Sequence, residues 1–311
     1  MVNSLRIATL LLPALLLAGC AGSGPATTAA GQAACGWQLQ PNRTIDGGWD
    51  GTNFIQFRRP VALAADINGI WFYDAGHRAV LRLEPFTDAL ATVLSARLSA
   101  DTQLALDKFG QLYLADPRQG KILRFDETTG QTEVFADGIG FAPSLLALDN
   151  QGRVLVADDM AGRILALNSL GGREDIGGII EGDRFSRIGG LATDGERLWV
   201  SDPVQRRVQA FTDGRLVAEI SHPGLIQPGP LAVDQQGRVI VADTFNRQLF
   251  VFTPDTDARD AKPTTLSLGS LDGLTVGFGE VYVADGVAGR IHVLGVSARA
   301  CEENSPRSGG G

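Results

Sequence analysis

The chain has 311 residues, 44% of them hydrophobic, which is enough to build the core of one large or two ordinary domains. Its 39 glycines, against 3 histidines and 2 methionines, favour a turn-rich β protein. A formal net charge of -8 argues against a nucleic-acid partner, because phosphate binding draws on a basic surface.

The first residues have the pattern of an export signal. Arg6 precedes the apolar run IATLLLPALLLAG, which at about 13 residues is shorter than the ~20 needed to cross a bilayer. The run ends in Leu17-Ala18-Gly19-Cys20, which resembles the lipobox of bacterial lipoproteins. That resemblance implies a signal peptide over 1–19, a diacylglyceryl group on the Cys20 thiol and, because Ala21 rather than Asp follows, an outer-membrane location. The alternative is an ordinary secretory signal that ends near a cysteine.

The segments at the two ends of the mature chain are small and polar. We expect 20–34 to be a flexible tether, 35–301 to be the folded domain and 302–311 to be a disordered tail. With Cys20 lipidated, the remaining cysteines are Cys35 and Cys301. An oxidising cell envelope would let them form a disulfide, the alternative being two unrelated free thiols.

Two short motifs recur through the domain. The first is LAxD, seen as LALD at 104–107 and again at 146–149 and as LAVD at 231–234. The second is a β-rich run that ends in aspartate, at intervals of 41 to 44 residues. Its six strand-end aspartates are Asp74, Asp116, Asp158, Asp202, Asp243 and Asp285. Each unit predicts four strands, named a to d from first to last, separated by Gly, Asp and Asn turns.

Repeats of this length with four strands each predict an all-β, six-bladed β-propeller. The pattern LAxD, then G-x-L/V-x-V-A-D, then a basic residue and Ile or Val, resembles the NHL repeat over roughly 59–296. The sixth copy departs from it, with Gly277 in place of the first aspartate. This copy also lacks a strand d, and the spare strand at 36–45 is expected to supply it and close the ring. The closure would bring Cys35 close to Cys301.

The strand-end aspartates are present in every unit, which favours a structural role. Each carboxylate is placed to accept backbone N–H bonds and hold the b–c turn. A basic residue follows four or five positions later and is expected to pair with it. These basic residues are Arg78, Lys121, Arg163, Arg207, Arg247 and Arg290.

Strand alternation places the d–a and b–c loops on one face of the ring (the d–a/b–c face) and the a–b and c–d loops on the other (the a–b/c–d face). The second face is rich in carboxylates, whereas the first carries arginines and aromatic residues, the usual anchors of recognition surfaces. The candidate binding residues are Trp49, Phe54, Arg58, Arg59, His77, Arg184, Arg187 and Arg206. Arg118, Phe57, Phe141, Phe185 and Phe245 are assigned to the same face. The alternative is that the arginines pair with neighbouring aspartates and the aromatics fill gaps between blades.

Catalytic and metal-binding patterns are weak in this chain. The histidines are His77, His222 and His292, and no spacing brings all three together for zinc. The inner strands offer few oxygen ligands for calcium, chiefly Thr102, Gln103, Ser144 and Asp272. No motif for a nucleophile, a phosphate or a dinucleotide occurs in a usable context. We therefore expect no catalytic residue, metal or cofactor.

The sequence therefore predicts a lipid-anchored propeller of the bacterial cell envelope. Its partners would be the membrane, through the N-terminal lipid, and an envelope protein or anionic ligand, through the d–a/b–c face. It would act as a non-catalytic scaffold. The alternative is a metal-dependent hydrolase, lactonase or lyase with its site in the central channel, since propellers host many functions.

Overall fold

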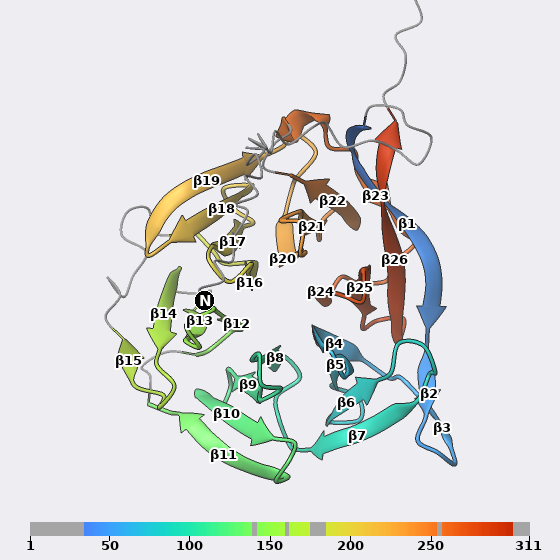
Figure 1. Ribbon diagram of the computed structural model, residues 1–311, viewed down its shortest axis with the longest axis vertical. Helices are drawn as coiled ribbons and strands as arrows, with labels where there is room; N and C mark the ends of the chain where they lie inside the picture. Colours follow the sequence, from blue (N-terminus) through green and yellow to red (C-terminus); the bar gives the residue numbers. More distant parts are fainter. Residues whose placement is uncertain (1–33, 139–141, 159–161, 175–184, 254–256, 301–311) are drawn as a thin grey trace, which may run out of the picture.

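The computed structural model describes residues 34–138, 142–158, 162–174, 185–253 and 257–300. They form six four-stranded antiparallel sheets, set as blades around a central axis, and one two-stranded hairpin (Figure 1). This confirms the predicted all-β, six-bladed propeller. The predictions for the signal peptide 1–19, for Cys20, for the tether up to residue 33 and for the tail 302–311 fall outside the described residues. Among the described residues, no helix is long and apolar enough to cross a bilayer.

The first three blades follow one another along the chain. In each blade the first strand lies nearest the central axis and the fourth strand lies outermost (Figure 1). Blade 1 holds β4 (Pro60–Asp66), β5 (Gly69–Asp74), β6 (Ala79–Leu83) and β7 (Leu90–Ser95). Blade 2 holds β8 (Gln103–Leu106), β9 (Leu112–Asp116), β10 (Lys121–Asp126) and β11 (Gln131–Ala136). Blade 3 holds β12 (Leu145–Leu148), β13 (Val154–Asp158), β14 (Arg163–Leu167) and β15 (Arg173–Glu174).

The other three blades complete the ring. Blade 4 holds β16 (Gly190–Thr193), β17 (Leu198–Asp202), β18 (Arg207–Thr212) and β19 (Arg215–Ser221). Blade 5 holds β20 (Pro228–Val233), β21 (Val239–Asp243), β22 (Gln248–Phe252) and β23 (Thr264–Thr265), with the short 3-10 helix η1 (Ala258–Asp260) before β23. Blade 6 holds β24 (Gly273–Gly277), β25 (Glu280–Asp285), β26 (Arg290–Ala300) and β1 (Ala34–Ile45). The hairpin of β2 (Gly47–Trp49) and β3 (Phe54–Gln56) joins β1 to blade 1.

The second strand of each blade explains why these sequences are apolar on both faces. Every residue of β5, β9, β13 and β21 is buried, because neighbouring blades pack against both sides of the sheet. Trp71 and Tyr282 are fully buried at equivalent positions in blades 1 and 6. The outermost strands are more exposed, and every residue of β19 is exposed or half-buried. The core is therefore a set of layers between blades.

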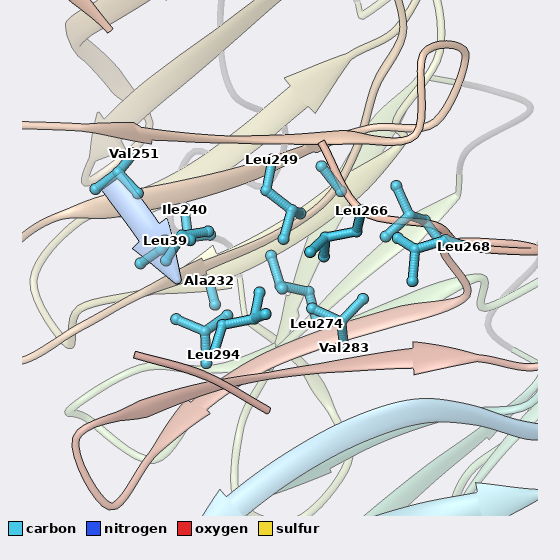
Figure 2. Close-up of a cluster of buried hydrophobic side chains, with 13 residues drawn as sticks. Leu39, Ala232, Ile240, Leu249, Val251, Leu266, Leu268, Leu274, Val283 and Leu294 are labelled. Atoms are coloured by element: carbon cyan, nitrogen blue, oxygen red, sulfur yellow. The ribbon is translucent and has the colours of Figure 1, made fainter. Parts of the chain in front are cut away.

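The N-terminal strand closes the ring as predicted. β1 pairs antiparallel with β26, from Ile45 opposite Ile291 to Ala34 opposite Ala300. Leu39, on β1, is buried among side chains of blades 5 and 6, including Leu249 (Figure 2). The strand therefore joins the first segment of the domain to the last. Cys301 follows Ala300 but lies outside the described residues, so the bridge from Cys35 to Cys301 stays a prediction.

The strand-end aspartates tie two loops of the same blade together. Asp74 accepts hydrogen bonds from the backbone N–H groups of Gly76 (2.9 Å) and His77 (3.0 Å) in the b–c turn. It also accepts bonds from the N–H groups of Arg58 (2.9 Å) and Arg59 (3.1 Å) in the segment before strand a. The same arrangement recurs at Asp116, Asp202, Asp243 and Asp285. These carboxylates hold the d–a/b–c face in shape.

Among the described residues, the expected pairing of these aspartates with basic residues is found in blade 3 and not in the other five blades. Arg163 and Asp158 form an ion pair at 3.3 Å. In blade 4, however, Arg207 pairs with Glu219 on the outer strand. In blade 5, Arg247 donates to the carbonyl of Leu268. At Asp243 the side-chain donor is instead the amide of Asn246 in the b–c turn, at 3.1 Å.

Candidate ligand-binding site

The d–a/b–c face is hollowed next to the axis by a cavity of about 560 Å³. Four of the six blades contribute its walls, through the starts of β8, β12, β16 and β20 and the b–c turns beside them. The central position of these four strands is visible in Figure 1. The lining residues are Asp101, Gln103, Pro117, Arg118, Ala142, Ser144, Leu145, Arg187, Ile188, Gly189, Pro203, Gln227, Pro228, Gly229, Pro230 and Thr244. We call this the axial cavity.

The walls of the axial cavity are stiff. Four of the lining residues are prolines, whose φ angles are fixed by the ring. Two inner strands also approach very closely, because a Cβ atom on Gly190 would come within 2.3 Å of the carbonyl oxygen of Gly229. Glycine is therefore required where blade 4 meets blade 5. A preformed cavity of this kind loses little conformational entropy when a ligand binds.

Charged and amide groups give the cavity its recognition chemistry. Arg118 forms a loose ion pair with Asp101, at 3.4 Å between Nε and Oδ1, and both side chains remain more than half exposed. Arg187 adds a second guanidinium, also on an exposed residue. Among the described lining residues, the charged side chains are two arginines and one aspartate, and Gln103 and Gln227 add side-chain amides. This combination suits a ligand with an anionic group.

Two hydroxyl groups in the cavity are already engaged with the backbone. The Ser144 hydroxyl donates to the carbonyl of Ala157 at 2.9 Å, and the Thr244 hydroxyl donates to the carbonyl of Gln227 at 3.1 Å. The Thr244 hydroxyl oxygen keeps acceptor capacity. The Thr244 hydroxyl is not set up as a nucleophile, because its proton is held by a carbonyl rather than by a base.

The structure brings few of the predicted binding residues to the axial cavity. Arg187 lines it, whereas Arg58, Arg59 and His77 belong to the d–a and b–c loops around blade 1, and Arg206 lies in the b–c turn of blade 4 without lining the cavity. Arg184 lies outside the described residues. Arg58, Arg59, His77 and Arg206 therefore lie in loops of the predicted face but outside the axial cavity, and their role in binding stays a prediction. The sequence predicted on which face of the ring each loop lies. It did not predict which loop residues reach the central axis.

Trp49 and Phe54 lie on the outer rim of the ring. Their rings form an edge-to-face pair at 5.6 Å on the hairpin β2–β3, which sits outside blade 1 (Figure 1). The backbone N–H of Trp49 donates to the carbonyl of Asp88, in the c–d turn of that blade. Placing them on the d–a/b–c face was an error, because the hairpin folds outward along the blade.

Other aromatic residues assigned to this face have a packing role instead. Phe57 and Phe185 are buried, each in edge-to-face contact with another core ring, Phe72 and Phe211 respectively. This matches the alternative that aromatics fill gaps between blades. Phe245 remains 68% exposed, and Phe141 lies outside the described residues.

Several lining residues were missed as binding candidates from the sequence. Asp101, Gln227 and Thr244 precede strand a or follow strand b in their blades, which is the same position in the repeat as Arg187 and Arg118. Comparing such positions from blade to blade would have found them. Gln103 and Ser144 had been noted as polar residues of the inner strands.

The three histidines lie in separate surroundings. His77 has Nε2 at 2.9 Å from the carbonyl oxygen of Gln56, on the outer side of blade 1. His222 accepts a bond from the N–H of Gly224 and packs on Phe250 at 4.9 Å between ring centres. Among the described residues, no group of three His, Cys, Asp or Glu side chains is arranged to hold a metal ion. The axial cavity contains none of the three imidazoles.

His292 is the histidine with the most restricted environment. It lies on β26, with Nδ1 at 3.3 Å from the hydroxyl of Thr44 and Nε2 at 3.7 Å from a carboxylate oxygen of Asp285. Burial lowers the pKa of His292, and the nearby Asp285 carboxylate opposes this shift without cancelling it. Burial also lowers the pKa of His222. Both imidazoles are therefore biased toward the neutral form.

No protein-family model matches the chain, and no curated protein matches it. Solved structures do match. A selenomethionine-substituted virginiamycin B lyase from Staphylococcus aureus aligns with a TM-score of 0.62 and 11% identity, over 83% of this chain and 99% of the lyase. A streptogramin B lyase aligns with a TM-score of 0.61 and 12% identity, over 84% and 98% of the two chains. A catalytically inactive variant of the Staphylococcus aureus lyase with quinupristin gives 0.60 and 13%, over 83% and 99%. At such identities the likeness shows the propeller fold alone.

Proposed function

We propose that this protein is a non-catalytic binding protein that captures an anionic ligand, or an anionic group of an envelope protein, in the axial cavity. The observation that carries the proposal is the cavity itself, about 560 Å³ in volume, with two arginines and one aspartate among its described lining residues. Volumes of this size are typical of pockets that hold small ligands or peptide segments. Its four prolines favour a site that is ready before binding.

The cavity favours an anion for electrostatic reasons. The guanidinium of Arg118 meets Asp101 only at 3.4 Å and at an exposed site, where an ion pair is worth at most ~1 kcal/mol. A carboxylate or phosphate oxygen would therefore compete with Asp101 at little cost, and bidentate contact with guanidinium groups is strong. Gln103 and Gln227 supply amide donors that would orient the bound group.

The location that we propose for this function is the cell envelope. In this proposal Cys20 carries the lipid, 20–34 is the tether, and a Cys35–Cys301 disulfide secures the closing strand. The pairing of Ala34 with Ala300 supports the last point, because it brings the start of β1 to the end of β26. The intact mass of the mature protein, with and without reductant, tests both modifications.

The second candidate is a lyase or hydrolase, and the fold likeness to virginiamycin B lyase and streptogramin B lyase favours it. Against it stands the separation of the histidines, since none of them lines the axial cavity. Metal analysis of the purified protein separates the two candidates. Stoichiometric calcium or zinc would favour the enzyme, and its absence after growth with both metals would favour the binding protein.

Capture of partners from envelope extracts tests the proposed function. The full-length protein, kept in detergent, would be compared with the double variant Arg118→Glu and Arg187→Glu. We expect the double variant to lose the bound partner or anion. The matched control is Arg206→Glu, which reverses an exposed charge in a b–c turn on the same face outside the cavity. Unchanged capture by the double variant, or equal loss in the control, would overturn the assignment to the cavity.

A further inference from the structure

A second cavity, of about 250 Å³, opens on the opposite, a–b/c–d face. It lies between blades 3 and 4, and its walls come from the a–b turns of both blades, from β14 and from the c–d turn of blade 4. We call it the interblade cavity. Its volume suits one amino-acid side chain or one small molecule, and none of its lining residues belongs to the axial cavity.

The interblade cavity has an apolar floor. Ile164 and Phe211, from the facing sheets of blades 3 and 4, are buried beneath it. Leu165 and Leu198 are only half-buried and leave aliphatic surface uncovered in its wall. A ligand body that covers this surface would gain about 25 cal/mol for each Å² removed from water. The floor therefore selects an aliphatic or aromatic body.

The arginines of this cavity are not available to a ligand. Arg153 pairs with Asp149 at 2.6 Å, and Arg197 pairs with Asp194 at 2.8 Å. In each case the aspartate also accepts the backbone N–H of its own arginine and holds the a–b turn. The same pairing recurs in blade 5 at Asp234 and Arg238. These are repeated structural contacts, so the cavity offers no cation to an anionic ligand.

Two further carboxylates in the lining differ from these. Glu196 and Asp213 are exposed residues, and neither side chain has a hydrogen-bond or ion-pair partner among the described residues. They stand on separate turns of blade 4, one between strands a and b and one between strands c and d. Their charges are therefore uncompensated over an apolar floor.

A smaller cavity on the same face shows that this combination is not general. It has a volume of about 120 Å³, lies between blades 5 and 6 and is lined by Asp234 and Arg238. The carboxylate of Asp234 forms an ion pair with Arg238, at 2.5 Å between Oδ2 and Nε. Among its described lining residues, this smaller cavity has no unpaired carboxylate, unlike the interblade cavity.

From the apolar floor and the two free carboxylates, we propose that the interblade cavity binds an organic cation. The ligand class is a primary ammonium or guanidinium group carried on a short apolar body. The body would cover Leu165 and Leu198, and the cationic group would lie toward Glu196 and Asp213. The source is either a free amine or a lysine or arginine side chain of a partner protein.

Calorimetric titration of the full-length protein in detergent tests this proposal. The probes are n-pentylamine, 1-pentanol and pentanoate, which share one apolar body and differ in charge. We expect n-pentylamine to bind at least tenfold more tightly than 1-pentanol, and pentanoate to bind least. Equal binding of the amine and the alcohol, or no binding of the amine, would overturn the proposal.

The double variant Glu196→Gln and Asp213→Asn locates the site. Both residues are exposed, and asparagine tolerates the positive φ of 48° at position 213, so the fold is expected to be retained. We expect at least a tenfold loss of amine affinity. The matched control is Asp88→Asn, at a φ of 54° in the equivalent c–d turn of blade 1, which should leave affinity unchanged. Unchanged binding in the double variant would overturn the assignment.

Two arms of the same titration identify the source of the cation. A blocked Gly-Lys-Gly peptide that binds more tightly than n-pentylamine would indicate a side chain of a partner protein. A peptide that binds more weakly would indicate a free amine. The axial cavity variant Arg118→Glu and Arg187→Glu should bind the amine as the unmodified protein does, so failure of the proposed anion site and failure of this site are distinguishable.

Discussion

The closing strand gives the sharpest test of how this propeller is stabilised. Leu39, on β1, is 4% exposed and belongs to the same buried cluster as Leu249, Val251 and Leu294. We expect Leu39→Ala to lower the free energy of unfolding by about 3 kcal/mol, since buried Leu→Ala changes cost roughly 2–5 kcal/mol. For a domain of this size each kcal/mol shifts Tm by about 2–4 °C. The expected loss is therefore roughly 6–12 °C.

Thermal unfolding followed by circular dichroism, with urea unfolding as a second measurement, checks this value. The matched control is Leu216→Ala, on the outermost strand of blade 4, where the leucine is 53% exposed. That change should alter stability by less than ~0.5 kcal/mol. If Leu39→Ala costs less than ~1 kcal/mol, or no more than Leu216→Ala, then β1 does not close the ring by burial and the reasoning fails.

Three further changes test the loops, the blade contacts and the buried histidine. Asp243→Ala removes the acceptor of five N–H groups and should cost about 3 kcal/mol or more in urea unfolding, with Asp243→Asn intermediate. Gly190→Ala places a methyl group 2.3 Å from the carbonyl oxygen of Gly229 and should cost about 1–3 kcal/mol by the same measurement. Because burial lowers the pKa of His292 below its unfolded value of 6.5, the unfolded state binds the proton more tightly, so this group's contribution to stability should fall as pH drops below about 6.5. The variant His292→Gln should show a shallower loss of Tm over that range.

Each of these expectations has an outcome that contradicts it. Equal stability of Asp243→Ala and the unmodified protein would mean that water replaces Asp243 as the acceptor for these N–H groups. For Gly190, the comparison is Gly172→Ala, where the nearest atom to the new Cβ is the side-chain nitrogen of Asn168, at 3.3 Å. Equal effects of the two changes would refute close contact between blades 4 and 5. An unchanged acid slope in His292→Gln would assign the pH dependence to other groups. Asp285 acts in a lower pH range: burial raises its pKa, but backbone N–H donors from Ala288, Gly269 and Ser270 outweigh burial and hold the pKa below 3.8, so its contribution to stability is lost only as the pH falls below about 3.8.

The number of blades and the way the ring closes could be predicted from the sequence. Local spacing carries this information, because each blade repeats the same turn chemistry at nearly constant intervals. Asp74 and Asp243 occupy equivalent positions and accept equivalent backbone N–H bonds. The missing outer strand of the last blade and the spare strand at 36–45 pointed to the same closure, which β1 and β26 make.

The distance of each loop from the axis could not be predicted in this way. Strand alternation assigns a loop to one face, but the route of that loop depends on its length and on its packing against the next blade. Trp49 and Phe54 fold outward on a hairpin, whereas Asp101 and Gln227 precede their strands directly and reach the axial cavity.

What the sequence determined by itself is the repeating unit, its four strands and the aspartates that hold its turns, since these depend on contacts within one blade. What only the tertiary structure decided is which side chains meet. Arg118 and Arg187 come from blades 2 and 4, and they share a cavity because a closed ring brings the starts of the inner strands together around one axis. Packing of blade 3 beside blade 4 likewise places Glu196 and Asp213, which have no partner among the described residues, in one cavity with the apolar side chain of Leu165.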